Sequence, residues 1–226
     1  MTTNIDKDNT KCVVFDLDGT LLNTIETINY YLNLSLSHHG LSCVSRAETM
    51  AFVGNGATKL IERAMDRVGA DKSLFDSIFQ VYNDAYNAGP YYLTEAYEGI
   101  GELLTSLKKE RFRLAVLSNK PDFAVKAAVN RFFPHTFDIV LGGRDNIPLK
   151  PSPDALIDIM SDLGLSASEI VYIGDSEVDV FTAKNAGVDK AIFVSWGFRT
   201  VEQLVAVGAS TPVDTPSQIL EIIKKR

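Results

Sequence analysis

Short apolar runs alternate with amphipathic stretches along most of the 226-residue chain. Each run is too short for a helix and is closed by small or polar residues, which is typical of buried β-strands. The runs that predict strands are Val13–Phe15, Leu114–Leu117, Phe137–Leu141, Ile170–Ile173 and Ala191–Val194. Because runs this apolar suit a parallel sheet covered on both faces, the alternation predicts a doubly wound α/β core.

Helical patterns lie between these runs. Ser152-Pro153 predicts an N-cap with proline in the first helical turn, and Gly164 predicts where that helix stops. The stretch Val178–Ala186 predicts a second helix, which Gly187 would close. Pro121 is suited to open a third.

Residues 23–92 break the alternation. They contain helical patterns at Ile25–His38, Thr58–Val68 and Leu74–Tyr86, and no convincing strand. We therefore predict a small all-α cap domain over residues 23–92. It would be inserted between two segments of one core domain, residues 1–22 and 93–226.

Composition and charge limit the kinds of molecule and compartment that suit this chain. A net charge of −7 repels nucleic acid, so an anionic substrate must be held by local cations. No apolar run approaches the roughly 20 residues that a membrane helix needs. Cys12 and Cys43 lack the spacing of a disulfide framework or a metal site, which predicts reduced thiols and a cytoplasmic protein. Monomer and homodimer both stay open.

The first strand runs directly into Asp16-Leu17-Asp18-Gly19-Thr20. Two carboxylates two residues apart at a strand end can both face a ligand where the strand opens into a loop. One can attack phosphorus while the other moves a proton, if their surroundings separate their pKa values. An ordinary Asp-Gly turn is the alternative, but three apolar strand residues before Asp16 favour a functional site.

Two further polar pairs follow along the chain. The hydroxyl of Ser118 and the backbone N–H groups around Asn119 could hold phosphate oxygens near a helix N-terminus. Taken alone, this pair is better explained as a helix cap before Pro121. Lys150 stands just before Pro151, at what we expect to be another strand end. A lysine fixed there can neutralise charge on a phosphoryl group during its transfer.

The fourth feature is the acidic segment from Gly174 to Asp179, which contains Asp175, Ser176 and Glu177. An acidic cluster at a strand end is costly unless a cation neutralises it. Oxygen ligands of this kind suit Mg²⁺, which takes one or two protein carboxylates together with waters and a phosphate oxygen. Asp179 also fits the acidic first turn of a helix.

The order of the four features is Asp-x-Asp-Gly-Thr, Ser-Asn, Lys-Pro and Gly-Asp-Ser-x-x-Asp. In this order the chain, from about Lys11 onward, resembles the phosphatases of the haloacid dehalogenase superfamily. The resemblance implies a Rossmann-like core with a mobile cap. It also implies a magnesium-dependent phosphatase that acts on small phosphorylated metabolites.

The resemblance also implies a role for each matching residue. Asp16 would be the nucleophile and a metal ligand. Asp18 would be the general acid and base and would bind Mg²⁺ through its backbone carbonyl. Lys150 would bridge the nucleophile and the phosphate. The phosphate would be held by Thr20, Ser118 and Asn119. Asp175 would be the third protein ligand of the metal site, and Asp179 would either support the metal there or orient Lys150.

Within the superfamily the chain most resembles phosphoglycolate phosphatases. Gly54-Asn55-Gly56 is similar to their cap specificity loop, and the resemblance implies that these three residues bind substrate. Trp196-Gly197-Phe198-Arg199 is also similar to their sequence. Asn23 departs from the family, whose members often carry an aspartate soon after the first motif, and this weakens the choice of substrate.

Three alternatives remain. A sugar-phosphate mutase resembles the chain in motifs and cap, but mutases commonly carry a smaller or apolar residue at the position of Thr20. An inorganic pyrophosphatase is possible because related caps accept pyrophosphate. A catalytically inactive binding domain is disfavoured because Asp16, Asp18, Lys150 and Asp175 are all present.

Overall fold

The computed structural model describes residues 9–89, 91–210 and 212–224. The chain divides into two compact units, one of Met1–Leu22 with Ala96–Arg226 and one of Asn23–Glu95. The second division falls after Glu95 rather than after residue 92. Thr27 explains this difference, because its hydroxyl bonds the Tyr92 carbonyl and lies 2.7 Å from the Thr94 hydroxyl.

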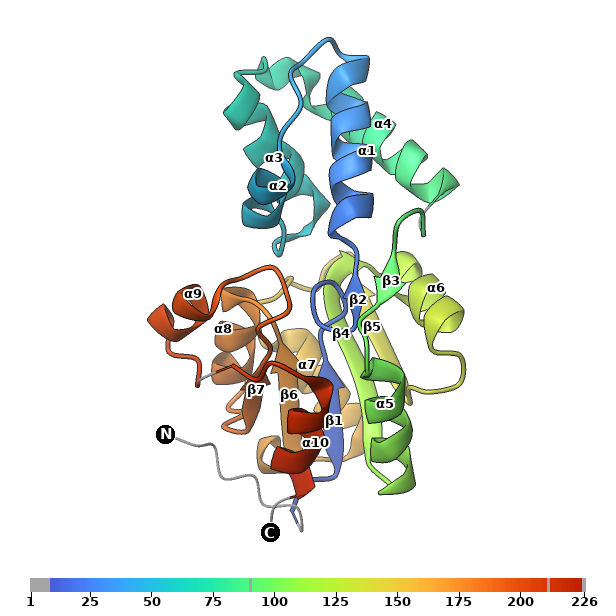
Figure 1. Cartoon of the computed structure of the whole chain (residues 1–226), viewed down its shortest axis with the longest axis vertical. Coiled ribbons are helices and arrows are strands. Elements are labelled where there is room, and N and C mark those ends of the chain that lie inside the picture. Colours follow the sequence, from blue (N-terminus) through green and yellow to red (C-terminus); the bar gives the residue numbers. More distant parts are fainter. Residues whose placement is uncertain (1–8, 90, 211, 225–226) are drawn as a thin grey trace. The chain divides into compact units, whose positions relative to one another are not determined.

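A five-stranded parallel sheet forms the centre of the larger unit (Figure 1). Its strands are β1 (Cys12–Phe15), β4 (Arg113–Pro121), β5 (Ile139–Gly143), β6 (Ile170–Gly174) and β7 (Ala191–Phe193). Their order is β5-β4-β1-β6-β7. The first strand is therefore the middle one, and all four of its residues are buried. This topology confirms the predicted doubly wound α/β core.

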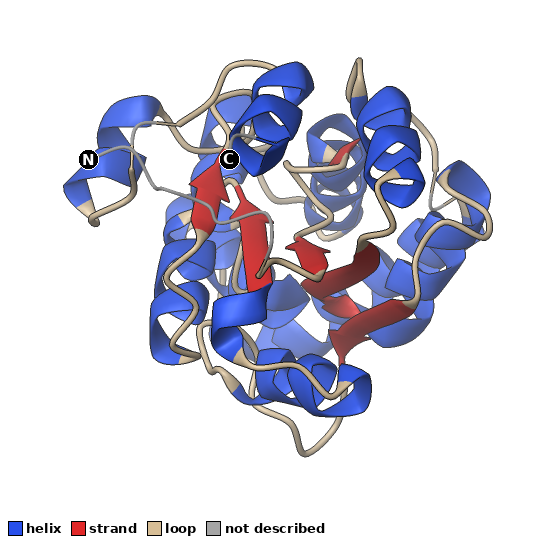
Figure 2. Cartoon of the chain, turned by 90° about the horizontal axis from the view of Figure 1, so that it is seen from below, coloured by secondary structure: helices blue, strands red, loops and turns tan. Residues whose placement is uncertain are grey.

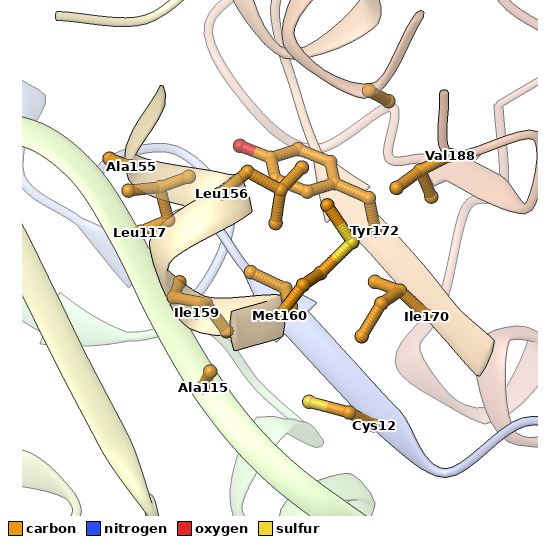
Figure 3. Packing of buried hydrophobic residues seen from close by; sticks show 12 residues of the cluster. Cys12, Ala115, Leu117, Ala155, Leu156, Ile159, Met160, Ile170, Tyr172 and Val188 are labelled. Carbon is orange, nitrogen blue, oxygen red and sulfur yellow. The ribbon is translucent and has the colours of Figure 1, made fainter. Parts of the chain in front are cut away.

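Helices lie on both sides of this sheet (Figure 2). They are α5 (Ile100–Lys109), α6 (Asp122–Phe132), α7 (Asp154–Leu163), α8 (Glu177–Asn185), α9 (Val201–Ala206) and α10 (Pro216–Lys224), with a 3-10 turn η2 (Ala167–Glu169). Leu156, Ile159 and Met160 of α7 pack onto Val14 and Tyr172 in one apolar cluster (Figure 3). This cluster fixes the strands whose ends carry the polar motifs.

The smaller unit is helical. Its elements are α1 (Ile25–His38), α2 (Arg46–Phe52), α3 (Gly56–Val68), the 3-10 turn η1 (Lys72–Leu74) and α4 (Phe75–Ala88). The chain passes between the units through β2 (Leu22–Asn23) and β3 (Glu95–Ala96), which pair in a two-stranded sheet. The predicted helix Ile25–His38 agrees with α1 at both ends.

Three local predictions need correction. The third strand begins at Ile139 rather than Phe137. The helix expected to be capped by Ser152 begins at Asp154 with Pro153 as its N-cap, and the Ser152 hydroxyl bonds the Asp154 side chain rather than a helical N–H. Lys150 does not follow a strand end directly, since β5 already stops at Gly143.

Candidate active site

Asp16 continues the central strand past its end. Its backbone N–H donates to the Ile173 carbonyl at 2.8 Å, so the strand pairing with β6 extends to this residue. The side chain accepts a hydrogen bond from the Leu17 N–H at 2.7 Å. The carboxylate is thus fixed at the carboxyl edge of the sheet, where ligands bind in open α/β folds.

Lys150 lies between two of the predicted carboxylates. Its Nζ is 3.0 Å from Oδ1 of Asp16 and 2.7 Å from Oδ1 of Asp179, and it donates to the Tyr172 hydroxyl at 3.2 Å. Only 3% of the lysine side chain is exposed. Burial would lower the pKa of Lys150, but the carboxylates of Asp16 and then Asp179 outweigh it and hold that pKa well above its usual range.

Asn119 holds the backbone of Lys150. Its Nδ2 donates to the Lys150 carbonyl at 2.9 Å, and its Oδ1 accepts from the Lys150 N–H at 2.8 Å. Ser118 and Asn119 lie within β4 rather than after it, at a register shift between Leu117 and Pro121 that interrupts the regular pairing with β5. Ser118 is buried, and its Oγ accepts from the Lys120 N–H at 3.3 Å.

Asp179 is fully buried and organises the loop before α8. Its Oδ2 accepts hydrogen bonds from the Ser176 hydroxyl at 2.6 Å and from the N–H groups of Ser176 and Asp175 at 3.1 and 3.3 Å. Its Oδ1 accepts from Lys150 and, at 2.9 Å, from the Tyr172 hydroxyl. Burial raises the pKa of Asp179, but Lys150 more than reverses this effect, so the group is held as a carboxylate.

Asp175 lies beside the first motif. Its Oδ1 accepts from the Thr20 hydroxyl at 3.2 Å, and its Oδ2 accepts from the Phe198 N–H at 2.7 Å. Gly19 has a φ of +89°, and a Cβ there would come within 2.3 Å of the Asp175 carboxylate. The glycine of the Asp-Gly-Thr motif is therefore required both for its backbone conformation and for the close approach of Asp175.

Three of the predicted carboxylates meet in one cluster. Oxygen atoms of Asp16, Asp175 and Asp179 lie within 4.8 Å of one another, and all three residues are buried. The structure therefore places three of the four predicted metal-site residues next to one another. The side chain of Asp18 lies outside it, which is compatible with the predicted contact through the backbone carbonyl.

The electrostatics of this cluster favour a cation. Burial raises the pKa of Asp16 well above its usual range although Lys150 opposes it. Burial, and after it the Asp179 carboxylate, raise the pKa of Asp175 to about 7. A bound metal ion would stabilise the ionised form of both carboxyl groups and so lower their pKa values. Carboxylate oxygens are also the ligands that hard divalent cations prefer.

Asp18 pairs with a residue that the sequence motifs do not include. Its Oδ1 and Oδ2 accept hydrogen bonds from Lys120 Nζ at 3.2 and 3.3 Å. The side chains are 19% exposed for Asp18 and 11% for Lys120. The position of Lys120, two residues after Ser118, is the sequence signal that could have identified it.

The segment Trp196-Gly197-Phe198-Arg199, which resembles the family sequence, also supports the site. Trp196 Nε1 donates to the Thr20 carbonyl at 3.1 Å. Arg199 is buried and binds Glu177 through two nitrogens at 2.6 and 3.1 Å. Together with the Phe198 N–H on Asp175, these bonds fix the loops that carry Thr20 and Asp175.

Gly54, Asn55 and Gly56 belong to the helical unit. Gly54 and Gly56 have φ values of +113° and +83°, a conformation that side chains disfavour. Arg63 of α3 donates to Asn55 Oδ1 at 2.7 Å and to the Phe52 carbonyl at 2.6 Å. The loop is thus a shaped turn held by Arg63, and substrate binding by these three residues stays a prediction.

The comparisons with known proteins now decide the family. The profile of the haloacid dehalogenase-like hydrolases matches residues 13–193. The chain belongs to this family. A phosphoglycolate phosphatase of Cereibacter sphaeroides is 36% identical over 191 residues, which are 83% of this chain and 86% of that protein. One of Vibrio parahaemolyticus is 31% identical over 219 residues, which cover 94% and 96% of the two chains.

A solved structure agrees with this assignment. The crystal structure of a "predicted phosphoglycolate phosphatase" from Haemophilus somnus superposes with a TM-score of 0.88 at 28% identity, covering 96% of this chain and 99% of the other. These relatives and the family match support the assignment of this haloacid dehalogenase-like hydrolase as a phosphatase enzyme. Phosphatases of the family need a divalent metal ion, and the buried carboxylates of Asp16, Asp175 and Asp179 fit one.

None of the described helices combines the length and the apolar composition that a membrane crossing requires. Both cysteines are free thiols in the structure, with Cys12 buried in β1 and Cys43 exposed.

Proposed function

We propose that this phosphatase hydrolyses 2-phosphoglycolate or a similar small phosphomonoester in the cytoplasm, with Mg²⁺ as its metal and Asp16 as the phosphorylated group. The observation that carries the mechanism is the contact of Lys150 with both Asp16 and Asp179 beside the carboxylate of Asp175. The choice of substrate is supported by the two curated relatives, which are phosphoglycolate phosphatases over nearly the same length.

The first chemical step would form a bond between a carboxylate oxygen of Asp16 and phosphorus. The bond between phosphorus and the ester oxygen breaks, and the carboxyl group of Asp18 donates its proton to the leaving oxygen. In the second step Asp18 accepts a proton from water, whose oxygen attacks phosphorus. Inorganic phosphate then leaves, and the Asp16 carboxylate is restored.

The remaining residues would hold the reacting groups. Lys150 supplies a fixed positive charge to Asp16 and to the phosphoryl oxygens, and Asp179 keeps that lysine in place. Thr20 and Ser118 would donate hydrogen bonds to the phosphate. Asn119 is proposed as a phosphate-binding residue through its backbone, since its side chain is engaged by Lys150.

The metal would be held by carboxylate oxygens of Asp16 and Asp175 and by the backbone carbonyl of Asp18. When bound, it supplies positive charge to the phosphoryl oxygens during transfer. Asp179 lies in the same cluster, but five hydrogen bonds already occupy its two oxygens. We therefore propose that Asp179 supports the metal site by orienting Lys150 and the Asp175 loop.

The proposal is tested by measuring phosphate release from a panel of small phosphorylated compounds, with and without Mg²⁺. We expect 2-phosphoglycolate to give the highest kcat/KM and a chelator to abolish activity. Faster cleavage of pyrophosphate, or isomerisation of a sugar phosphate, would instead support one of the two enzyme alternatives. Absence of any turnover in the presence of Mg²⁺ would favour an inactive binding domain.

Metal binding should depend on pH through Asp175. The folded-state pKa of this group, about 7, is raised above its unfolded value, so its contribution to the stability of the metal-free protein is present below pH 4 and lost as pH rises through 7. Mg²⁺ binds the ionised form and should offset this loss. At a Mg²⁺ concentration of 100 times its Kd, we expect the unfolding temperature to rise by about 5–10 °C at pH 8.

The rise in unfolding temperature caused by Mg²⁺ should be much smaller at pH 5.5, because protons compete with the metal for the Asp175 carboxylate. Differential scanning fluorimetry at the two pH values, with and without Mg²⁺, measures both shifts. Asp175→Asn should remove most of the shift at pH 8, whereas Asp138→Asn, which changes an aspartate outside the carboxylate cluster, serves as a matched control. An equal shift at both pH values would contradict the assignment of Asp175 to the metal.

A further inference from the structure

Lys120 places a second positive charge at the site, beside the carboxylate of Asp18. It lies near the end of β4, and its ammonium group contacts both oxygens of the Asp18 carboxylate at 3.2 and 3.3 Å. Neither the nucleophile nor the carboxylate cluster needs this lysine, because Lys150 already lies between Asp16 and Asp179.

The two lysines differ in how closely they are held. Lys150 binds Asp179 at 2.7 Å with side chains only 3% and 0% exposed. Lys120 binds Asp18 at longer distances, and its side chain is 11% exposed. Tight ammonium–carboxylate hydrogen bonds are about 2.7–2.9 Å long, so the Lys120 contact is the looser one. An ammonium group has three N–H donors and can bind a second anion beside the first.

The position of Lys120 relates it to the leaving group, and this step rests on the proposed function. The proton of Asp18 must pass to the leaving oxygen, so the two have to approach within about 3 Å. The leaving group departs on the side opposite the attacking oxygen of Asp16. A charged group one carbon beyond the leaving oxygen would then lie near Asp18 and within reach of Lys120.

We propose that Lys120 is a specificity-determining residue that binds a carboxylate on the leaving group of the substrate. In 2-phosphoglycolate the carboxylate is attached to the carbon that bears the leaving oxygen, which is the separation this geometry requires. The net negative charge of the chain strengthens the need for such a local cation. Lys120 would thus select carboxylated phosphomonoesters over neutral ones of the same size.

The test compares 2-phosphoglycolate with ethyl phosphate, in which a methyl group replaces the carboxylate. The measured quantity is the ratio of their kcat/KM values, because any effect of Lys120 through Asp18 acts on both substrates and cancels. We expect Lys120→Met to lower this ratio by about 10- to 100-fold, as for the loss of a hydrogen bond between charged groups. Lys120→Arg keeps the charge and should keep most of the ratio.

Lys126→Met is the matched control, since Lys126 also pairs with an aspartate, Asp122, but is 56% exposed on α6. Its ratio should equal that of the wild type. If the wild type prefers phosphoglycolate and Lys120→Met leaves the ratio unchanged, the role of Lys120 is overturned while the proposed function stands. A wild type that cleaves both substrates equally well overturns the choice of substrate together with the role of Lys120.

Discussion

Asp16→Asn is expected to lower turnover by a factor on the order of 10⁴ or more, because an amide has nearly the shape of the carboxylate but is a poor nucleophile. The fold should survive. Burial makes the charged form of Asp16 unfavourable, and Lys150 keeps its ion pair with Asp179 in this variant, so the neutral amide should cost little stability. Phosphate release and the unfolding temperature, measured on the same preparation, check the two expectations.

A second measurement tests whether the phosphoryl group is transferred to Asp16 itself. Acid quenching during turnover should trap a phosphorylated peptide that contains Asp16 in the wild type and no such peptide in Asp16→Asn. Asp122→Asn changes a carboxylate at the start of α6 and should retain wild-type turnover. Substantial activity of Asp16→Asn would rule out attack by this residue, whatever its effect on stability.

Lys150→Met is expected to reduce both stability and activity. It leaves the carboxylates of Asp16 and Asp179 buried without their cation, and breaking a buried ion pair by removing one partner costs about 3–5 kcal/mol. Loss of a fixed charge that faces the phosphoryl group should lower kcat by at least about 10²–10³-fold. Chemical denaturation and steady-state kinetics measure the two losses.

Two further variants separate these effects. Lys59→Met removes an exposed lysine paired with Glu62 and should change stability by less than about 1 kcal/mol. Adding Asp179→Asn to Lys150→Met removes one of the uncompensated charges and should restore part of the stability without restoring activity. If Lys150→Met were as stable as the wild type, the buried charges would not depend on this lysine in the way we describe.

Local sequence patterns predicted those helices and strands for which the pattern and the tertiary packing favour the same secondary structure. Ile25–His38 has one consistent helical pattern and forms α1 over the same residues. The helix α5 went unpredicted although Ile100, Leu103, Leu104 and Leu107 repeat at helical spacing and are buried. Ser45 and Glu48 form a capping box before α2, which is another signal present in the sequence.

The site residues were predictable where a motif lies close to its strand, as at Asp16 and Asp175. Tyr172 lies inside β6 and reads as an ordinary apolar strand residue, yet its hydroxyl contacts Lys150 and Asp179. Asn119 contacts a residue 31 positions away, and Trp196 one 176 positions away. Contacts between such distant segments depend on the assembled sheet, and no local pattern encodes them.

The central place of β1 has a consequence for the order of events during synthesis. This strand leaves the ribosome before the other strands of its sheet, but its two neighbours pair with it only after Arg113 and Ile170 have been made. Both edges of the strand therefore wait for partners while the helices of residues 23–95 are already complete, and such long-range pairing is slow. Catalytic competence should appear only after Asp179 has emerged, when β1, β4, β5 and β6 have been made and only the edge strand β7 is still to follow.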